Sequence, residues 1–523
     1  MSAAGRFATR RIVDDPADRP YRAPTHGHQR RLRLRRRHRS PPRRRRGTRR
    51  DQPRRDVPRP ARLARELRRA RRPGADPHPP RRDRRRARAR LRESQGAADG
   101  GGGPRHRRPP AREHGDVQRV LRSRADVRRF EPSTPPHPDP RAIDDAARRL
   151  VEARFPLIVV ENLGRRSEAT APLCRLAEVL AAPLVDLAVE YQGRPSVPSS
   201  HPLDMSGARQ EVVAEADVVL ALDVTSFLGA LGQTDRSTRE VRWLNESSRI
   251  IAISLDDYAF RSWAHTFQSL APVDLPIAAD AALALPALLA AVEDRLKRDA
   301  RAADRQARAQ RIAARHAAVQ AEWRAAVALE RSSKPVAPSV LAAEVWNVIK
   351  DEDWVLANGT GKGWARRLWD WRPERTYGGS GGAGLGYGLP AALGVTLAHR
   401  GSGKICVNLQ ADGDMLYVAN GLYTAAHHRL PLLTVMFNNR TYGNDEEHQE
   451  AVAKTRGRPV ENKVIGIRID DPAPDFAKIA QGFGVHAEGP VDSADAIGPA
   501  LRRALRVVKD EGRPALVDVL TRL

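Results

Sequence analysis

The sequence predicts an α/β protein in which an arginine-rich segment precedes two domains built on parallel sheets. From about Glu131 onward, apolar runs of strand length alternate with stretches of helical periodicity, which is typical of parallel strands covered by helices. A length of 523 residues accommodates about three domains of roughly 150 residues each. We therefore expect a segment 1–130, a central α/β domain 131–300, a helical linker 301–337 and a C-terminal α/β domain 338–523.

Positive charge is concentrated in the first quarter of the chain. The whole chain has 91 Lys plus Arg and 63 Asp plus Glu, which gives a formal net charge of +28. Residues 1–130 contain 44 Arg, no Lys and 13 acidic residues, a net charge of +31, whereas residues 131–523 have a net charge of −3. This distribution excludes a uniformly basic nucleic-acid-binding protein.

The composition of residues 1–130 differs from that of a folded domain. Ile, Leu, Val and Phe together number 14, about 11% of the segment, below the roughly 20% of chains that fold. Three interpretations remain open: a disordered segment, a polybasic arm that binds nucleic acid, or the wrong-frame translation of a GC-rich gene. The wrong frame is favoured, because Arg, Pro, Ala and Gly have GC-rich codons. Nucleic acid is not expected as a partner, because aromatic residues that stack on bases are nearly absent.

Neither export nor membrane insertion is predicted. The longest apolar run, Ala281 to Val292, has 12 residues and contains Pro286, whereas a membrane span needs about 20. The only two cysteines, Cys174 and Cys406, are too few for a disulfide framework and are typical of a reducing compartment. We therefore expect a cytoplasmic protein.

The central domain is predicted from alternating strands and helices. Its strands are expected at 157–160, 183–187, 217–222 and 249–254, and its helices at 141–153, 169–181 and 281–297. A long solvated helix over 298–329 follows and leads into the linker. The polar run from His201 to Asp204 is interpreted as a loop rather than a site.

Polar turns follow two strands of the C-terminal domain. Strand 404–409 leads into Gln410 to Asp414, a helix is expected over 418–429, and strand 431–437 leads into Asn438 to Asp445. Because parallel strands end at the same edge of a sheet, we expect Asp412 and Asn439 to converge. One carboxylate, one amide oxygen and a backbone carbonyl form a partial shell of hard oxygen ligands for Mg²⁺. The alternative is two polar turns in which Gly413 and Gly443 serve only backbone conformation.

This pair of turns resembles the thiamine diphosphate signature, in which Gly-Asp-Gly at one strand end is followed by Asn-Asn after a helix and a strand. Ala411 stands here for the first glycine, and the spacing from the Asp to the second Asn matches that of the family. The resemblance implies that Asp412, the side chain of Asn439 and the carbonyl of Thr441 hold Mg²⁺ on the diphosphate of the cofactor.

Two further segments resemble elements of the same family. Residues 355–361 resemble the strand and turn that cradle the diphosphate, and residues 381–392 resemble its glycine-rich segment. In that alignment Leu385 is the bulky wedge that bends the cofactor, and the carbonyl of Ala383 accepts a hydrogen bond from the aminopyrimidine. The cofactor-binding residues implied are Gly359, Thr360, Gly361, Ala383, Leu385, Asp412, Gly413, Asp414 and Asn439. A dinucleotide fingerprint made by Gly384, Gly386 and Gly388 is discounted, because no strand precedes it.

The resemblance covers residues 338–523 with specific motifs. Over residues 136–300 it rests only on the general pattern of strands and helices, in which the chain is similar to the acetolactate synthase and benzoylformate decarboxylase group. Some members of that group bind FAD, but no matching loop is recognisable here, and FAD is not counted among the expected cofactors. The family begins with a pyrimidine-binding domain that supplies an activating glutamate. None of Glu66, Glu93 and Glu113 follows a strand. We assign that role to none of them, and the missing domain favours the wrong-frame interpretation.

The resemblance implies a thiamine diphosphate- and Mg²⁺-dependent enzyme that decarboxylates 2-oxo acids or joins them to a second carbonyl, as a lyase or a transferase. A homodimer or homotetramer is implied for an intact protein, because the cofactor lies between subunits in the family. Two alternatives stay open: a catalytically impaired relative that binds the cofactor without the activating glutamate, and a nucleic-acid-binding protein that uses the arginine-rich segment.

The catalytic candidates are Tyr442 and Asp445, which lie just beyond the Asn-Asn turn. Asp445 is a candidate for proton transfer. Its alternative role is a solvated first-turn residue of a helix, where acidic side chains interact favourably with the helix dipole. His427 and His428 are interpreted as packing or surface residues.

Overall fold

The computed structural model describes residues 133–187, 194–235, 240–255, 272–359, 363–377 and 384–523. The segment 1–130, and with it the glutamates considered above, lies outside the described residues, as do Thr360, Gly361 and Ala383. Residues 125–523 cluster into one compact unit. Within it, helices and parallel strands alternate as expected, which confirms the predicted fold class.

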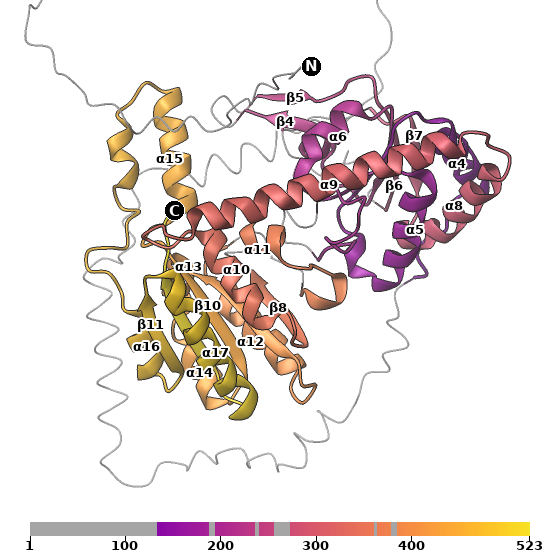
Figure 1. Ribbon diagram of the computed structural model, residues 1–523. Helices are drawn as coiled ribbons and strands as arrows, with labels where there is room; N and C mark the ends of the chain where they lie inside the picture. The colour runs from indigo at the N-terminus through magenta and orange to yellow at the C-terminus, as the bar shows by residue number, and fades with distance from the viewer. Residues whose placement is uncertain (1–132, 188–193, 236–239, 256–271, 360–362, 378–383) are drawn as a thin grey trace, which may run out of the picture. The chain divides into compact units, whose positions relative to one another are not determined.

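The central domain is built on a five-stranded parallel sheet with the strand order β2-β1-β3-β6-β7. Figure 1 labels β6 and β7 of this sheet. Its strands are β1 (Pro156–Val160), β2 (Leu184–Asp186), β3 (Val218–Leu222), β6 (Arg249–Ser254) and β7 (Leu275–Ala278). Its main helices are α4 (Pro140–Glu152), α5 (Thr170–Leu180), α6 (Arg209–Glu215) and α8 (Ala281–Leu296).

The helices of the central domain start where the sequence supplies caps. Asp139 accepts a hydrogen bond from the backbone N–H of Arg141 at 2.9 Å and precedes α4, whose first residue is Pro140. Asp280 caps α8 by accepting from Ala282 and Leu283 at 2.9 and 3.2 Å. One face of helix α4 buries Ile143, Ala146, Ala147 and Leu150 in the core of this domain. The same core contains every residue from Leu157 to Val160 of β1. Full burial of β1 is expected for a parallel strand with both faces covered.

Several short elements of this region were not predicted, namely α6, the edge strand β7 and the three elements described next. Strands β4 (Gly232–Thr234) and β5 (Val241–Trp243) form a short antiparallel pair next to α7 (Phe227–Leu231). These elements have three to five residues, too few to show periodicity in the sequence.

Helix α9 (Ala302–Glu330) is the long helix expected over 298–329. Only Ile312 of its residues is buried, as expected for a solvated helix. Arg308 of α9 donates to the carbonyls of Leu180 and Ala181 at 2.7 and 3.0 Å, and so satisfies the end of α5. No helix in the described part of the chain is long and apolar enough to cross a membrane.

The C-terminal domain contains a second five-stranded parallel sheet, with the order β11-β12-β10-β9-β8. Its strands are β8 (Trp354–Gly359), β9 (Ile405–Ala411), β10 (Leu432–Asn438), β11 (His486–Val491) and β12 (Ala515–Leu520). Its helices are α10 (Pro338–Ile349), α11 (Gly363–Leu368), α12 (Gly388–Ala398), α13 (Asp412–Val418), α14 (Gly421–His427), α15 (Gly443–Thr455), α16 (Phe476–Gly482) and α17 (Ala494–Asp510).

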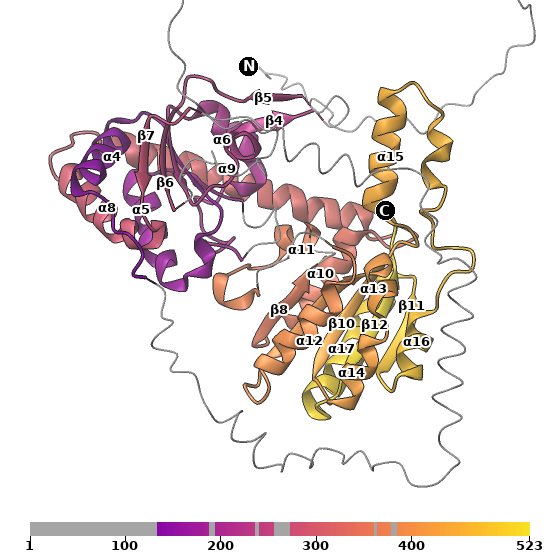
Figure 2. The same cartoon turned by 180° about the vertical axis from the view of Figure 1, so that it is seen from behind.

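Alternate residues of each strand in this sheet pack into two separate cores. Trp354 and Leu356 of β8 belong to the core beneath α10 and α17, whereas Val355 and Ala357 belong to the core beneath α12, α14 and α16. Figures 1 and 2 view these helix layers from opposite sides. Consecutive side chains of a β-strand point to opposite faces of the sheet. A continuous apolar run in the sequence therefore contributes residues to both cores.

The predicted extent of the helix over 418–429 is wrong. The structure has two helices there, α13 and α14, and α13 begins directly at Asp412, where β9 ends. Gly413 and Asp414, interpreted from the sequence as turn residues, therefore lie in the first turn of α13. Acidic residues favour the first turn of a helix, because they interact with the positive end of its dipole.

Candidate cofactor and metal site

The two polar turns converge as predicted. Strands β9 and β10 are parallel neighbours whose register pairs Ala411 with Phe437, so their carboxyl ends lie side by side. The backbone N–H groups of Arg440 and Thr441 lie close enough to the carboxylate of Asp412 to lower its pKa, although their geometry does not give hydrogen bonds to it. The turn after β10 therefore folds onto the first residue of α13.

Asp412 has a buried carboxylate with one unsatisfied oxygen. Its Oδ1 accepts from the backbone N–H of Gly413 at 2.8 Å, whereas Oδ2 is buried without a hydrogen-bond partner. Burial raises the pKa of Asp412 to about 6, against the opposing effect of the nearby backbone N–H groups. A buried carboxylate with an unsatisfied oxygen is costly unless a cation compensates it. This donor fits a hard divalent cation, because Mg²⁺ prefers carboxylate, amide and carbonyl oxygens.

The turn after β10 is held in a defined conformation. Asn439 Oδ1 accepts from the backbone N–H of Thr441 at 3.2 Å, and Arg440 has a positive φ of 55°. Thr441 is buried and its hydroxyl donates to Glu446 at 2.9 Å. Glu446, which is also buried, interacts with Arg468 at 3.1 Å. These contacts fix the backbone of Thr441, the predicted metal ligand.

Glu446 was missed by the sequence analysis. It stands in a run of polar residues at the start of α15, and nothing in the sequence distinguishes it from its solvated neighbours. Its burial depends on Lys463, in the short 3-10 helix Val460–Val464 that follows α15, and on Arg468 beyond that helix. They lie 3.5 and 3.1 Å from its carboxylate.

Tyr442 packs closely against Gly413. A Cβ atom at Gly413 would lie 2.5 Å from Cε1 of Tyr442, so only glycine fits beneath the ring. The pKa of Tyr442 is raised by burial and by the charges of its neighbours, among them Asp412 and Asp445. Asp445 is exposed in the first turn of α15. This position agrees with its alternative interpretation as a solvated residue at the start of a helix.

The glycine-rich segment lies against α13. Leu385 is 47% exposed, and the next residue, Gly386, has a φ of +89°. The carboxylate of Asp414 accepts from the backbone N–H of Gly386 at 2.6 Å and from the side-chain amide of Gln410. Asp414, predicted to bind the cofactor, therefore directs its two carboxylate oxygens to protein donors. Gly359 is the last residue of β8.

Buried polar side chains beneath this edge were also missed. They all lie in strands of the structure, although Gln410 and Asn438 were predicted to begin the two polar turns; they are Asn358, Asn408, Gln410, Thr434, Asn438 and Asp518. Asn438 donates to both carboxylate oxygens of Asp518 at 3.0 and 3.2 Å, while its own Oδ1 is buried without a partner. Burial, together with the charge of Asp412, raises the pKa of Asp518 to about 6. Polar residues within an apolar strand are the signal that could have drawn attention to this layer.

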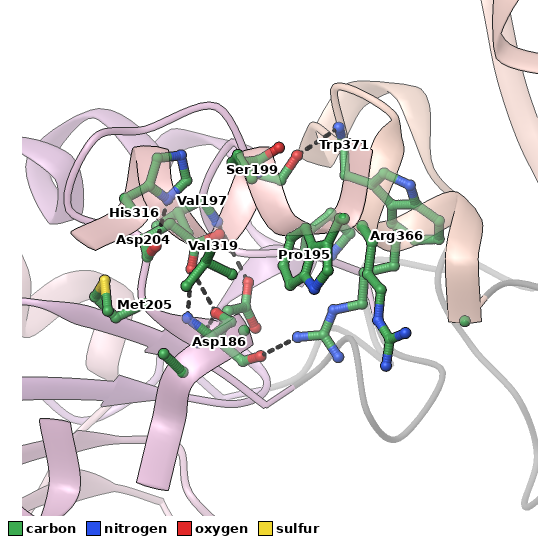
Figure 3. A pocket seen from close by; sticks show the side chains of 17 residues that line it. Asp186, Pro195, Val197, Ser199, Asp204, Met205, His316, Val319, Arg366 and Trp371 are labelled. Carbon is green, nitrogen blue, oxygen red and sulfur yellow. Dashed lines mark hydrogen bonds between the residues drawn. The ribbon is translucent and has the colours of Figure 1, made fainter. Parts of the chain in front are cut away.

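A separate cavity of about 510 Å³ lies where β2, α9 and α11 come together (Figure 3). Asp186, Asp204, His316, Arg366 and Trp371 are among the residues that line it. Arg366 donates to the carbonyl of Asp186 at 3.1 Å, and the carbonyl of Asp204 lies 2.7 Å from Nδ1 of His316. None of the predicted cofactor or metal residues is among the residues that line this cavity.

The fold defines an α/β protein with two parallel sheets, and the buried polar groups at the carboxyl edge of the second sheet form a candidate cation and cofactor site. Comparison with protein families identifies the family to which this chain belongs. Residues 143–288 match the central domain of thiamine pyrophosphate enzymes, and residues 357–519 match the C-terminal thiamine pyrophosphate-binding domain, together more than half of the chain. The chain therefore belongs to the thiamine pyrophosphate enzyme family, as its motifs indicated.

Its relatives include acetolactate synthases. The acetolactate synthase large subunit of Haemophilus influenzae is 25% identical over 391 residues, which is 73% of this chain and 62% of the relative. The sulfoacetaldehyde acetyltransferase of Castellaniella defragrans is 24% identical over 406 residues, or 73% and 62% of the two chains. The structure of benzoylformate decarboxylase from Polynucleobacter necessarius has the same fold, with a TM-score of 0.52, 21% identity and coverage of 75% of this chain and 66% of that one. The chain spans less than two thirds of the length of the curated relatives it matches.

Proposed function

We propose that the protein is a thiamine diphosphate- and Mg²⁺-dependent enzyme, similar to acetolactate synthase, that decarboxylates 2-oxo acids or condenses them with a second carbonyl. The observation that carries the proposal is the buried Oδ2 of Asp412, which has no hydrogen-bond partner. The turn that holds Asn439 and Thr441, the other proposed ligands, lies beside it. Membership of the thiamine pyrophosphate enzymes supports it. The names of its relatives, which include acetolactate synthases, an acetyltransferase and a probable 2-ketoarginine decarboxylase, support both outcomes of the reaction.

In this proposal the C-terminal sheet edge holds the diphosphate end of the cofactor. Asp412, the side chain of Asn439 and the carbonyl of Thr441 bind Mg²⁺, which serves as a template for the diphosphate. Gly359, Thr360, Gly361 and Gly413 let backbone N–H groups approach the phosphate oxygens. The bound cofactor supplies an electron sink for the loss of carbon dioxide from the substrate.

The reacting end of the cofactor is assigned to the glycine-rich segment and the start of α15. Leu385 supports the cofactor in a bent conformation, and the carbonyl of Ala383 accepts from its aminopyrimidine. Tyr442, like any tyrosine of ordinary pKa, keeps its hydroxyl proton at neutral pH and donates a hydrogen bond toward the substrate; burial raises its pKa further. Asp445 exchanges a proton with solvent from its exposed position.

We further propose that the enzyme acts in the cytoplasm as a homodimer or homotetramer. Large apolar side chains near the site are exposed in the single chain: Leu385 by 47%, Tyr417 by 63% and Tyr423 by 56%. Burial of such side chains against another subunit contributes about 25 cal/mol per Å² of apolar area, which opposes the entropic cost of association.

The proposal is tested by incubating the full chain with thiamine diphosphate, Mg²⁺ and a panel of 2-oxo acids, and measuring carbon dioxide release. Turnover that disappears in Asp412→Asn is the expected result. Cofactor binding without turnover of any 2-oxo acid would identify the catalytically impaired relative instead. Failure to bind thiamine diphosphate in the presence of Mg²⁺ would contradict the proposal altogether.

A further inference from the structure

A chain of four buried polar side chains crosses the C-terminal sheet toward the glycine-rich segment. Asn358, Asn408, Gln410 and Asp414 are 5%, 0%, 0% and 3% exposed, respectively. We call this set the buried polar chain. Burial of four such groups costs free energy that apolar residues of similar size would not cost, so their presence calls for an explanation.

The members of the buried polar chain are joined by successive hydrogen bonds. Asn358 Nδ2 donates to Asn408 Oδ1 at 2.8 Å, and Asn408 Nδ2 donates to Gln410 Oε1 at 3.2 Å. Gln410 Nε2 then donates to Asp414 Oδ2. Each side chain is both oriented and satisfied by the next one, so the position of Asp414 is fixed from β8 across β9.

The buried polar chain ends on the backbone of the glycine-rich segment. Asp414 Oδ1 accepts from the N–H of Gly386 at 2.6 Å. The turn at Gly386 packs directly on α13, because a Cβ atom there would lie 3.3 Å from Val418 and 3.4 Å from Tyr417. Gly388 packs on the chain itself: a Cβ atom at this glycine would lie 2.4 Å from Asp414 Oδ2 and 2.7 Å from Gln410 Oε1.

A carboxylate suits the end of this chain better than an amide. Both groups that face Asp414 are donors, namely the N–H of Gly386 and the Nε2 of Gln410, and an ionised carboxylate only accepts. An asparagine at position 414 would turn an N–H toward one of these donors and leave it without an acceptor. The loss of one hydrogen bond to a buried charged group is equivalent to about a tenfold change in a binding constant, or more.

We propose that Asp414 is a positioning residue, which holds Gly386 and thereby the adjacent Leu385 against α13 so that Leu385 can support the thiazolium end of the cofactor. The inference rests on the proposed function and assigns Asp414 an indirect part in it. Both oxygens of Asp414 are directed to protein donors, so its effect on the cofactor passes through Leu385 and not through the phosphate oxygens.

Two probes separate this role from phosphate binding: thiamine diphosphate and inorganic diphosphate, each titrated calorimetrically into the full chain with Mg²⁺. For Asp414→Asn we expect the dissociation constant of thiamine diphosphate to rise about tenfold and that of inorganic diphosphate to stay within about twofold. Leu385→Ala is the matched control and should give the same pattern. The double variant with both substitutions should be no worse than either single variant, because both remove the same support.

A second variant keeps the test decisive if Asp414→Asn folds poorly. In Gln410→Glu/Asp414→Asn the direction of the hydrogen bond between positions 410 and 414 is reversed, but every donor in the chain still meets an acceptor. We expect this swap to restore thiamine diphosphate binding to within about twofold of the wild type, whereas Gln410→Glu alone places two carboxylates together and weakens binding.

The inference is overturned if Asp414→Asn weakens the binding of inorganic diphosphate as much as that of thiamine diphosphate, since Asp414 would then act at the phosphate end of the cofactor. It is also overturned if Asp414→Asn lowers only the unfolding temperature and leaves both dissociation constants unchanged, since the chain would then serve folding alone. A wild-type protein that binds neither probe would contradict the proposed function itself, and the inference with it.

Discussion

At the carboxyl edge of the central sheet, Glu161 follows β1 and its carboxylate accepts from the backbone N–H and the hydroxyl of Thr225 at 2.6 and 2.5 Å. At the corresponding edge of the C-terminal sheet, Asp412 follows β9 and keeps one buried oxygen without a partner. Both sheets have five parallel strands. The comparison teaches that the shared architecture does not distinguish the two edges, whereas the hydrogen bonding of the carboxylate at each edge does.

The largest expected effect is at the unsatisfied carboxylate itself. Asp412→Asn removes the negative charge from the proposed metal ligand, and we expect the affinity for thiamine diphosphate with Mg²⁺ to fall about 100-fold or more. The matched control is Glu161→Gln at the edge of the central sheet, which should leave the affinity unchanged. Calorimetric titration of both variants checks the prediction, and an equal loss in both would remove the distinction between the two edges.

The next effect concerns the stability of the C-terminal edge. Asp518 is buried and its pKa is raised from an ordinary 3.8 to about 6, so the folded state holds a proton that the unfolded state has released. Its contribution to stability is therefore lost as the pH rises from about 4 to about 6. Asp518→Asn avoids this loss and can donate to the unsatisfied Oδ1 of Asn438.

We therefore expect Asp518→Asn to be more stable than the wild type at pH 7.5, by about 2 kcal/mol, and to lose most of this advantage at pH 4.5. Urea unfolding at the two pH values measures the difference. Asp492→Asn, a substitution of an exposed aspartate of the same domain, is the control and should show no such dependence. An advantage of equal size at both pH values would show that Asp518 does not titrate in this range.

The smallest effect is expected at the close contact between Gly413 and Tyr442. An alanine in a helix is ordinarily more stable than a glycine by about 1 kcal/mol. In Gly413→Ala the new methyl group would lie 2.5 Å from the tyrosine ring and displace it. We expect thiamine diphosphate to bind about tenfold more weakly, equivalent to about 1.4 kcal/mol.

Gly394→Ala in α12 is the control for helix propensity, since a Cβ atom there would have no neighbour within 4 Å. We expect it to stabilise the protein by about 0.5–1 kcal/mol without any change in cofactor affinity. Unchanged cofactor binding in Gly413→Ala would mean that the ring of Tyr442 has no part in the site.

Much of the fold and the convergence of the two turns could be predicted from the sequence, because both depend on local patterns. Apolar runs identify buried strands, and parallel strands end at one edge, which sufficed to bring Asp412 near the turn at Asn439. The buried polar chain could not be predicted in the same way. Asn408 lies in an apolar run and Gln410 was predicted to begin a polar turn, whereas their partners Asn358 and Asp414 come from other elements of the fold.

Glu446 shows the same limit. Its burial depends on Lys463 and Arg468, more than 15 residues away in sequence, so a run of acidic residues at the start of a helix is indistinguishable from a solvated one. The start of α13 at Asp412 was missed because glycine and aspartate next to each other are typical of turns. Sequence patterns therefore predicted which strands meet, while tertiary contacts determine which polar groups are buried there.

The most direct test is a calorimetric titration of thiamine diphosphate into the full wild-type chain, once with Mg²⁺ and once with EDTA. We predict one binding event per chain with Mg²⁺ and its loss in EDTA, because the carboxylate of Asp412 needs a cation before a diphosphate can approach it. Absence of binding in both titrations, or equal affinity with Mg²⁺ and with EDTA, would contradict the assignment of this sheet edge as a metal and cofactor site.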